Sequence, residues 1–173
     1  MAIGAGRRDG ERGETSMELS GEHTFAAPRD RVWQFMLDPE VLRGCLPGCE
    51  KLDLVGPDEY AATMKIGVAM IRGTFQGRVK ITDKQEPESY RMRVEGKGSQ
   101  GEVSGEGSLT LEEVDGQTVV RYSGEAAVRG TLARVGARVM QPAAKMIVGQ
   151  FFACLERTAT EAAETSAGTT TAT

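Results

Sequence analysis

Histidine and cysteine are scarce in this sequence, and their scarcity excludes several kinds of site. His23 is the single histidine among 173 residues, which rules out a multi-histidine metal site and argues against a serine–histidine–aspartate triad. The three cysteines are an odd number, which argues against a disulfide framework and predicts a reducing compartment.

Long apolar runs and strong charge of either sign are also missing. No stretch approaches the roughly 20 apolar residues of a membrane-spanning helix, and the N-terminus has no apolar signal-peptide core. The net charge of −4 gives no basic surface of the kind that nucleic-acid binding needs. No glycine-rich phosphate-binding motif occurs. We therefore expect a soluble, cytoplasmic protein that binds no nucleic acid.

Both ends of the chain have the composition of disordered tails. Residues 1–16 are rich in glycine, arginine and glutamate, and residues 164–173 are rich in threonine, serine and alanine. Such segments bury too little apolar surface to offset the entropy lost on ordering. The remaining residues, 17–163, have the length of one domain.

The apolar residues between the tails follow two different periods. Alternation predicts a first strand near Glu18–Phe25 and further strands from about residue 50 to about residue 129, with one buried and one solvated face. Two short helices, opened by Pro28 and Pro39, separate the first strand from the others. Helical spacing then predicts one long helix over Thr131–Ala163, kinked or broken at Pro142. This order predicts an α+β domain in which an antiparallel sheet of about seven strands is covered by the C-terminal helix.

Glycine is concentrated on the predicted inner face of the sheet, where a solid core would carry valine or isoleucine. The seven positions are Gly73, Gly77, Gly96, Gly98, Gly105, Gly107 and Gly124. They indicate an apolar ligand pocket beneath the helix, and the alternative is that they are bulges and bends around an ordinary packed core. The predicted pocket residues are Tyr60, Met64, Phe75, Gly77, Met92, Gly96, Gly105, Gly107, Tyr122, Met140, Met146 and Phe151. We expect the pocket beneath the middle strands, away from the first strand, with its opening near Gln141.

Several segments resemble the CoxG family of carbon monoxide dehydrogenase subunits. The similarity is carried by Met17-Glu-Leu-Ser-Gly-Glu-His-Thr-Phe25, Ala27-Pro28, Val32-Trp33, Asp38-Pro39-Glu40-Val41-Leu42 and, as the most specific run, Cys45-Leu-Pro-Gly-Cys-Glu50. Later segments such as Phe75-Gln-Gly-Arg-Val79 and Gln150-Phe-Phe152 are similar too. The resemblance covers nearly all of residues 17–157 and implies the helix-grip fold of the START-like (SRPBCC) and Bet v 1-like proteins.

The resemblance also implies a function, as an accessory protein beside a molybdenum-containing dehydrogenase of the carbon monoxide dehydrogenase type. Members of the family are linked to recruiting that enzyme to the cytoplasmic membrane and to carrying a lipophilic quinone. We therefore expect a non-enzymatic protein that binds a lipophilic small molecule, with a quinone as the first candidate, and that makes peripheral contact with the membrane. A pure docking or maturation factor is the second alternative.

A small enzyme acting on a hydrophobic substrate, such as a cyclase or hydratase, is the third alternative, because one fold hosts many functions. Its catalytic groups would come from His23, Tyr60, Glu102 and Tyr122. We interpret His23 first as a hydrogen-bonded histidine at a strand edge, and second as a polar group of the pocket. Cys45 and Cys49 are expected to be structural thiols, with a redox pair as the alternative, and Cys154 is expected in the core.

Overall fold

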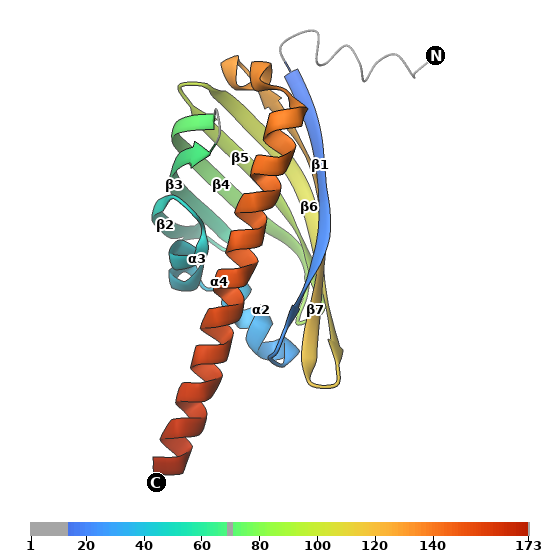
Figure 1. The fold of residues 1–173 in the computed structure, drawn as a ribbon, viewed down its shortest axis with the longest axis vertical. Helices are drawn as coiled ribbons and strands as arrows, with labels where there is room; N and C mark the ends of the chain where they lie inside the picture. Colours follow the sequence, from blue (N-terminus) through green and yellow to red (C-terminus); the bar gives the residue numbers. More distant parts are fainter. Residues whose placement is uncertain (1–13, 69–70, 173) are drawn as a thin grey trace, which may run out of the picture.

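The computed structural model describes residues 14–68 and 71–172 of the chain. Its centre is one antiparallel sheet of seven strands in the order β1-β7-β6-β5-β4-β3-β2, which curves around the long helix α4 (Figure 1). The strands are β1 (Glu14–Phe25), β2 (Cys49–Gly56), β3 (Glu59–Val68), β4 (Ile71–Gln85), β5 (Ser89–Gly98), β6 (Gly101–Val114) and β7 (Gln117–Arg129). The predicted α+β arrangement is confirmed.

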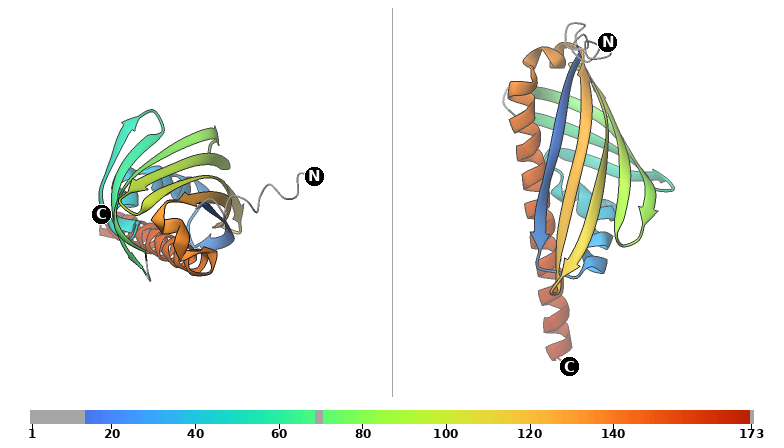
Figure 2. Two further views of the ribbon diagram at one scale, coloured as in Figure 1. Left: turned by 90° about the horizontal axis from the view of Figure 1, so that it is seen from above. Right: turned by 90° about the vertical axis from the view of Figure 1, so that its right-hand side faces the viewer.

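Seen along its length, the sheet is a trough, and α4 lies in its open side between the two edge strands β1 and β2 (Figure 2). Alternation sends every second side chain of each strand into the trough. Neighbouring strands from β2 to β7 are joined by short connections, and the chain turns between β6 and β7 at Asp115 and Gly116, both with positive φ of 53° and 79°. Such a pair suits a tight hairpin whose twist matches that of the strands.

Two short helices close one end of the trough. They are α2 (Arg29–Leu37) and α3 (Pro39–Cys45), as the two prolines predict. Asp38 ends α2 in an extended conformation and caps α3, because its carboxylate accepts a hydrogen bond of 2.9 Å from the backbone N–H of Glu40. Proline at the first position of α3 removes an N–H that would have no partner inside the helix.

The C-terminal segment breaks at a different residue from the one predicted. A short 3-10 helix, η2 (Thr131–Val135), ends at Gly136, and α4 (Ala137–Ala172) begins directly after it. Gly136 has a φ of 88°, which glycine adopts readily, so the chain changes direction there. Pro142 lies inside α4, so the prediction of a break at Pro142 was wrong.

Strand β1 and helix α4 extend beyond the predicted domain limits at 17 and 163. At the N-terminal side, Glu14 pairs with Arg129 of β7, so β1 begins three residues before Met17. Residues 1–13 of the predicted tail lie outside the described residues. At the other end, α4 continues through 164–172.

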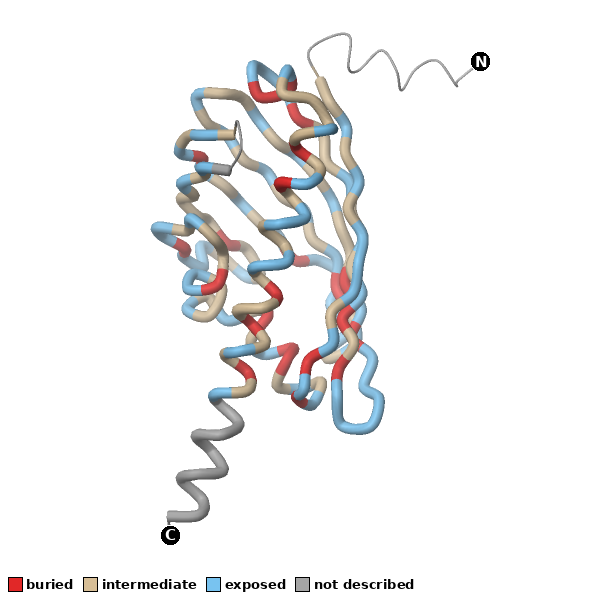
Figure 3. The backbone as a smooth tube through the Cα atoms, viewed as in Figure 1, coloured by how far each residue is buried: buried red, intermediate tan, exposed pale blue. Residues whose placement is uncertain are grey.

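Buried residues form two separate groups, one near each end of the trough (Figure 3). The larger group joins α2, the ends of the strands and α4, and includes Phe25, Trp33, Val120 and Leu155. The smaller group lies around η2 and the start of α4, and consists of Phe75, Val128, Leu132, Ala133 and Met140. Between the two groups, the middle of the sheet carries half-buried residues, and the candidate site lies there.

Candidate ligand-binding site

A cavity of about 450 Å³ lies between the inner face of the sheet and α4. This volume is in the usual range for small-molecule sites, and the side chains that line it are nearly all apolar. Its wall comes from β1 to β7, α2, α3 and α4, and consists of Met17, Leu19, Met36, Leu42, Leu46, Leu52, Tyr60, Val79, Ile81, Tyr90, Met92, Val94, Val103, Gly105, Gly107, Leu109, Tyr122, Gly124, Ala126, Val148, Phe151 and Phe152. Glu106, Ser108, Ser123 and Glu125 also border it, but strand alternation puts their side chains on the outer face.

Half of the predicted pocket residues meet in this cavity. They are Tyr60, Met92, Gly105, Gly107, Tyr122 and Phe151. The strand residues among them follow from alternation, because their strands pair in a register that places them on one face. In one row across the sheet, Tyr90 pairs with Leu109 and Leu109 pairs with Tyr122.

The other half of the predicted residues lies elsewhere. Phe75 and Met140 fill the smaller core group, Met146 is 47% exposed on α4, and Met64, Gly77 and Gly96 do not border the cavity. Phe75 and Met140 are absent from the cavity wall because side chains already fill their end of the trough. The ring of Phe75 lies over Gly98, where an added Cβ would be only 2.7 Å from it.

The cavity glycines also allow two strands to approach closely. An added Cβ at Gly105 would be 2.7 Å from the carbonyl oxygen of Glu125, and one at Gly124 would be 2.9 Å from that of Glu106. Real Cβ atoms do not come this close, so these residues serve the bending of the sheet as well as the open volume. Both interpretations of the glycine pattern therefore hold at these positions.

Sequence reasoning missed the part of the wall that comes from the ends of the trough. Met17 and Leu19 of β1 line the cavity, so the prediction that the pocket avoids the first strand was wrong. Alternation in β1 could have revealed both residues. Leu42 of α3 and Leu46 just after it also line the cavity, and nothing in the sequence says on which side of the sheet α3 packs.

Three tyrosines belong to the cavity wall. The hydroxyl of Tyr60 donates a hydrogen bond of 2.6 Å to the carbonyl oxygen of Leu37, and burial raises the pKa of this tyrosine. Tyr90 is almost wholly buried, which raises its pKa far above the usual value of a phenol. Tyr122 stacks on Phe152 with ring centres 5.2 Å apart.

Of the four candidate catalytic residues, Tyr60 and Tyr122 border the cavity, whereas His23 and Glu102 do not. His23 Nε2 lies 2.8 Å from a carboxylate oxygen of Glu156, which joins β1 to α4. Its ring also packs between Phe25 and Phe152, with centres 4.9 and 5.8 Å away. These contacts fit the first interpretation of His23, as a hydrogen-bonded residue of the strand.

The structure joins Cys45 to Cys154 in a disulfide and leaves Cys49 as the free thiol. This contradicts the expectation that Cys45 and Cys49 are unpaired structural thiols, and also its alternative, a redox pair between the two. Cys45 ends α3 and Cys154 lies in α4, so the partners are neighbours only in the folded chain. Burial raises the pKa of the Cys49 thiol, which makes it a weaker nucleophile at neutral pH.

Neither a metal centre nor a membrane span is found in the part of the chain that the structure describes. In these residues no three side chains of the histidine, cysteine, aspartate and glutamate types gather in a way that could hold a metal ion. Among the same residues, no helix is long and apolar enough to cross a membrane.

Most of the domain matches a known protein family. Residues 21–160 match the family described as the CoxG subunit of carbon monoxide dehydrogenase. The chain belongs to this family. A comparison with curated proteins finds no significant match.

Solved structures of the same architecture include relatives at different distances. A conserved protein from Geobacillus kaustophilus has 30% sequence identity and a TM-score of 0.81, and the match covers 84% of this chain and 96% of that one. The ZhuI aromatase/cyclase from Streptomyces sp. R1128 has 16% identity and a TM-score of 0.64, covering 83% and 93%. Norcoclaurine synthase from Thalictrum flavum, solved with dopamine and hydroxybenzaldehyde, has 13% identity and a TM-score of 0.61, covering 89% and 91%. The two enzymes share the helix-grip fold with this CoxG protein. Because the sequence identity is low, the similarity extends to the fold alone.

Proposed function

We propose that this CoxG protein is a non-enzymatic carrier that holds a lipophilic small molecule, with a quinone as the first candidate, in the cavity under α4. The observation that carries the proposal is the cavity itself, with about 450 Å³ lined by apolar side chains. A packed core leaves few voids larger than a water molecule, so a space of this size is suited to an apolar ligand. The family name supports a second part of the proposal, that the protein acts as an accessory protein of a dehydrogenase of the carbon monoxide dehydrogenase type.

Trp33 makes the ligand proposal directly measurable. It is the single tryptophan of the chain, and its ring packs edge-on against Tyr90 of the cavity wall with centres 5.4 Å apart. A quinone bound in the cavity accepts energy or an electron from the excited indole and quenches its emission. Titration of the purified protein with a short-chain benzoquinone or naphthoquinone is therefore expected to give saturable quenching. Protein that is unaffected by every quinone tested, and that releases no apolar molecule into organic solvent, would contradict the proposal.

A substitution that fills the cavity tests whether quenching reports this site. Val94 lines the cavity and pairs with Gly105, so a larger side chain at position 94 has room to extend inward. We expect Val94→Phe to weaken quinone binding about tenfold or more, because it removes volume without removing a polar group. Val55→Phe is the matched control, since Val55 is 49% exposed and does not border the cavity.

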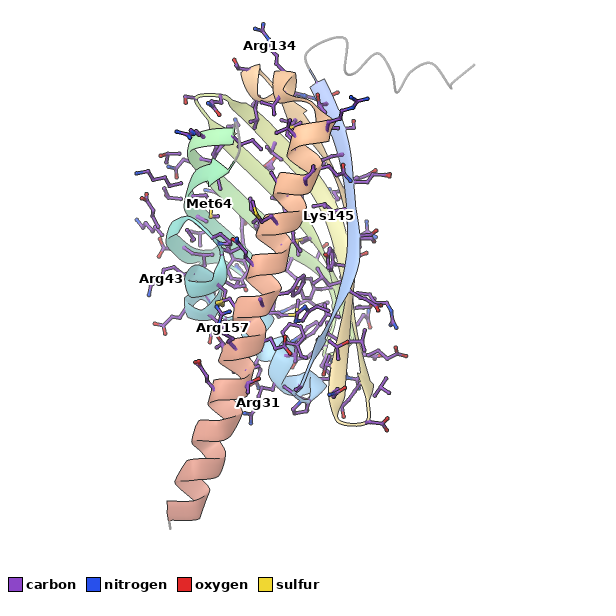
Figure 4. All side chains as sticks on the ribbon, in the orientation of Figure 1. Arg31, Arg43, Met64, Arg134, Lys145 and Arg157 are labelled. Carbon is purple, nitrogen blue, oxygen red and sulfur yellow. A yellow bond between two sulfur atoms is a disulfide. The ribbon has the colours of Figure 1, made fainter. Side chains whose placement is uncertain are left out.

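We further propose that the helical side of the molecule contacts an anionic membrane surface when the protein serves its enzyme. Arg43 of α3 and Lys145 and Arg157 of α4 lie along the side on which α4 covers the sheet (Figure 4), and none forms an ion pair with a described residue. Met146 is an exposed apolar neighbour of Lys145. Unpaired cations beside an apolar side chain suit a surface of anionic lipids.

Vesicle flotation tests the membrane part of the proposal separately. Binding to phosphatidylglycerol vesicles, and not to phosphatidylcholine vesicles, is expected for the wild-type protein. Lys145→Glu with Arg157→Glu should abolish it, whereas Arg72→Glu with Lys80→Glu, on the outer face of β4, should retain most of it. Loss of flotation in both double variants alike would contradict the assignment to the helical side.

Co-elution with a purified molybdenum-containing carbon monoxide dehydrogenase tests the enzyme partner.

A further inference from the structure

The polar groups of the cavity are few, and they differ in what they can still bind. Inner-face side chains contribute three hydroxyl groups, those of Tyr60, Tyr90 and Tyr122, to a wall that is otherwise apolar. The single proton of the Tyr60 hydroxyl is already donated to the carbonyl oxygen of Leu37. Tyr60 therefore has no proton left for a ligand.

The hydroxyl of Tyr122 is directed toward β1. An added Cβ on Gly21 would lie 2.5 Å from this oxygen, so the hydroxyl rests over the glycine at the edge of the sheet. Gly21 is also the residue that pairs with Tyr122 in the ladder between β1 and β7. The ring is held in this direction by its stacking on Phe152.

Tyr90 combines deep burial with a free hydroxyl. The residue is 3% exposed, and its hydroxyl has no hydrogen-bond partner in the described part of the chain. Among the described residues, Arg29 Nε is the one fully enclosed side-chain polar atom without a partner. The hydroxyl of Tyr90 is therefore not enclosed by protein, and since the residue lines the cavity, the open space beside this oxygen belongs to the cavity.

Two further facts make Tyr90 suited to donate a hydrogen bond. Packing against Trp33 fixes the ring, so little freedom is lost when a ligand binds. Burial keeps the phenol protonated, because it raises the pKa. A buried hydroxyl that has no partner is unfavourable, and a ligand atom that accepts its proton removes that cost.

We propose that Tyr90 Oη donates a hydrogen bond to a carbonyl oxygen of the bound molecule, so that the cavity prefers flat apolar molecules with a ring carbonyl to hydrocarbons of the same shape. This inference rests on the proposed function and specifies which residue selects the ligand. The carbonyl end of the ligand then lies beside Tyr90, near α2, and its apolar remainder lies along Met92, Val94 and Gly105. One hydrogen bond to a neutral acceptor corresponds to a preference of about tenfold.

The test compares two probes of nearly the same shape by calorimetric titration. The first is 2-methyl-1,4-naphthoquinone, and the second is 2-methylnaphthalene, which lacks both carbonyl groups. The wild-type protein is expected to prefer the quinone, and Tyr90→Phe is expected to lower quinone affinity about tenfold while the affinity for the hydrocarbon stays nearly constant. Tyr122→Phe is expected to change both affinities in the same proportion, because its hydroxyl is directed toward Gly21.

The outcomes separate the two proposals. Wild-type protein that binds neither probe contradicts the proposed function. Wild-type protein that binds both probes, with a Tyr90→Phe variant that changes neither affinity or both equally, overturns the role of Tyr90 alone. If Tyr90→Phe does not fold, the infrared carbonyl stretch of the quinone bound to the wild-type protein decides. A shift to lower frequency is expected for a hydrogen-bonded carbonyl, and an unshifted band overturns the inference.

Discussion

A disulfide joins Cys45 to Cys154 across 109 residues of sequence, with Cα atoms 5.3 Å apart. The bond links the end of α3 to α4, and both segments contribute to the cavity. Leu42 and Leu46 flank Cys45, and Phe151 and Phe152 lie about one turn before Cys154. The disulfide therefore fixes the distance between two walls of the cavity, in addition to linking two parts of the chain.

Reduction of this disulfide is expected to lower the stability of the fold. Closing a loop of this length restricts the unfolded chain, and removing such a bond costs about 2–5 kcal/mol. We expect Cys154→Ser, or addition of a dithiol reductant, to lower the free energy of unfolding by that amount. Urea denaturation with and without reductant measures the effect.

Cys49→Ser is the matched control for this prediction, since Cys49 is the free thiol. It should keep both the stability of the wild-type protein and its response to reductant. Cys154→Ser should have lost the response. If reductant destabilises Cys154→Ser as strongly as the wild-type protein, the stabilising link is not the bond between Cys45 and Cys154.

The position of the Tyr122 hydroxyl over Gly21 predicts a second effect. An alanine at position 21 places its Cβ against that oxygen, and the ring cannot move freely because it stacks on Phe152. We expect Gly21→Ala to cost about 1–3 kcal/mol of stability, measured by denaturant unfolding. Gly67→Ala in β3 is the control, because nothing lies within 4 Å of an added Cβ there.

A double variant shows whether the cost comes from this contact. Tyr122→Phe removes the oxygen that the added methyl group at position 21 would meet, so it should recover part of the stability lost in Gly21→Ala. The two substitutions should then be non-additive by about 0.5 kcal/mol or more. Full additivity would mean that the oxygen is not the source of the cost, because the ring carbon Cζ, 2.8 Å from the added Cβ, remains in Tyr122→Phe.

His23 and Glu156 share one hydrogen bond, but we expect substitutions at the two positions to lower the stability of the protein by different amounts. The side chains are 28% and 38% exposed, so the ionic part of the contact is weak, at about 1 kcal/mol or less. His23 also packs between Phe25 and Phe152, whereas the side chain of Glu156 has no ring to pack. Thermal unfolding should therefore show a larger loss for His23→Ala, about 1–2 kcal/mol, than for Glu156→Gln. Equal losses would mean that ring packing contributes nothing.

The fold could be predicted from the sequence because each element has a strong local signal. Strand alternation, the prolines that begin α2 and α3, and the helical spacing of the C-terminal segment all depend on neighbours in the chain. A kink or break is predicted at Pro142, since a proline inside a helix is the more familiar signal, whereas the chain breaks at Gly136. Gly136 needed its positive φ to be recognised, and the sequence does not contain that information.

The cavity was predicted only in part, because its limits depend on contacts between distant residues. Alternation gives the face on which Phe75 and Tyr122 lie, but only packing shows that Phe75 fills the space over Gly98 while Tyr122 borders open space. The pairing of Cys45 with Cys154 is hidden for the same reason. A spacing argument considers cysteines that are close in sequence, and this pair is brought together by α3 packing on α4.

Alkaline pH is expected to destabilise the protein through Tyr90. In the unfolded chain a tyrosine loses its proton near pH 10, whereas burial raises the pKa of Tyr90 in the folded state well above that value. Between these two pKa values the folded state holds one proton more than the unfolded state. The free energy of unfolding therefore falls as the pH rises above about 10, and the contribution of Tyr90 is fully present below that pH. Tyr60, whose pKa burial also raises, acts in the same direction.

Tyr90→Phe separates this contribution from the general effect of high pH, because phenylalanine has no proton to lose. Urea denaturation at several pH values from about 8 to about 12 should show a less steep loss of stability for Tyr90→Phe than for the wild-type protein. Tyr60→Phe should also reduce the slope, because burial raises the pKa of Tyr60 in the folded state. The same slope in the wild-type protein and in Tyr90→Phe would mean that this phenol loses its proton equally easily in both states. Its hydroxyl would then face water and not an apolar environment, and the ligand-selecting role of Tyr90 would lose its physical basis.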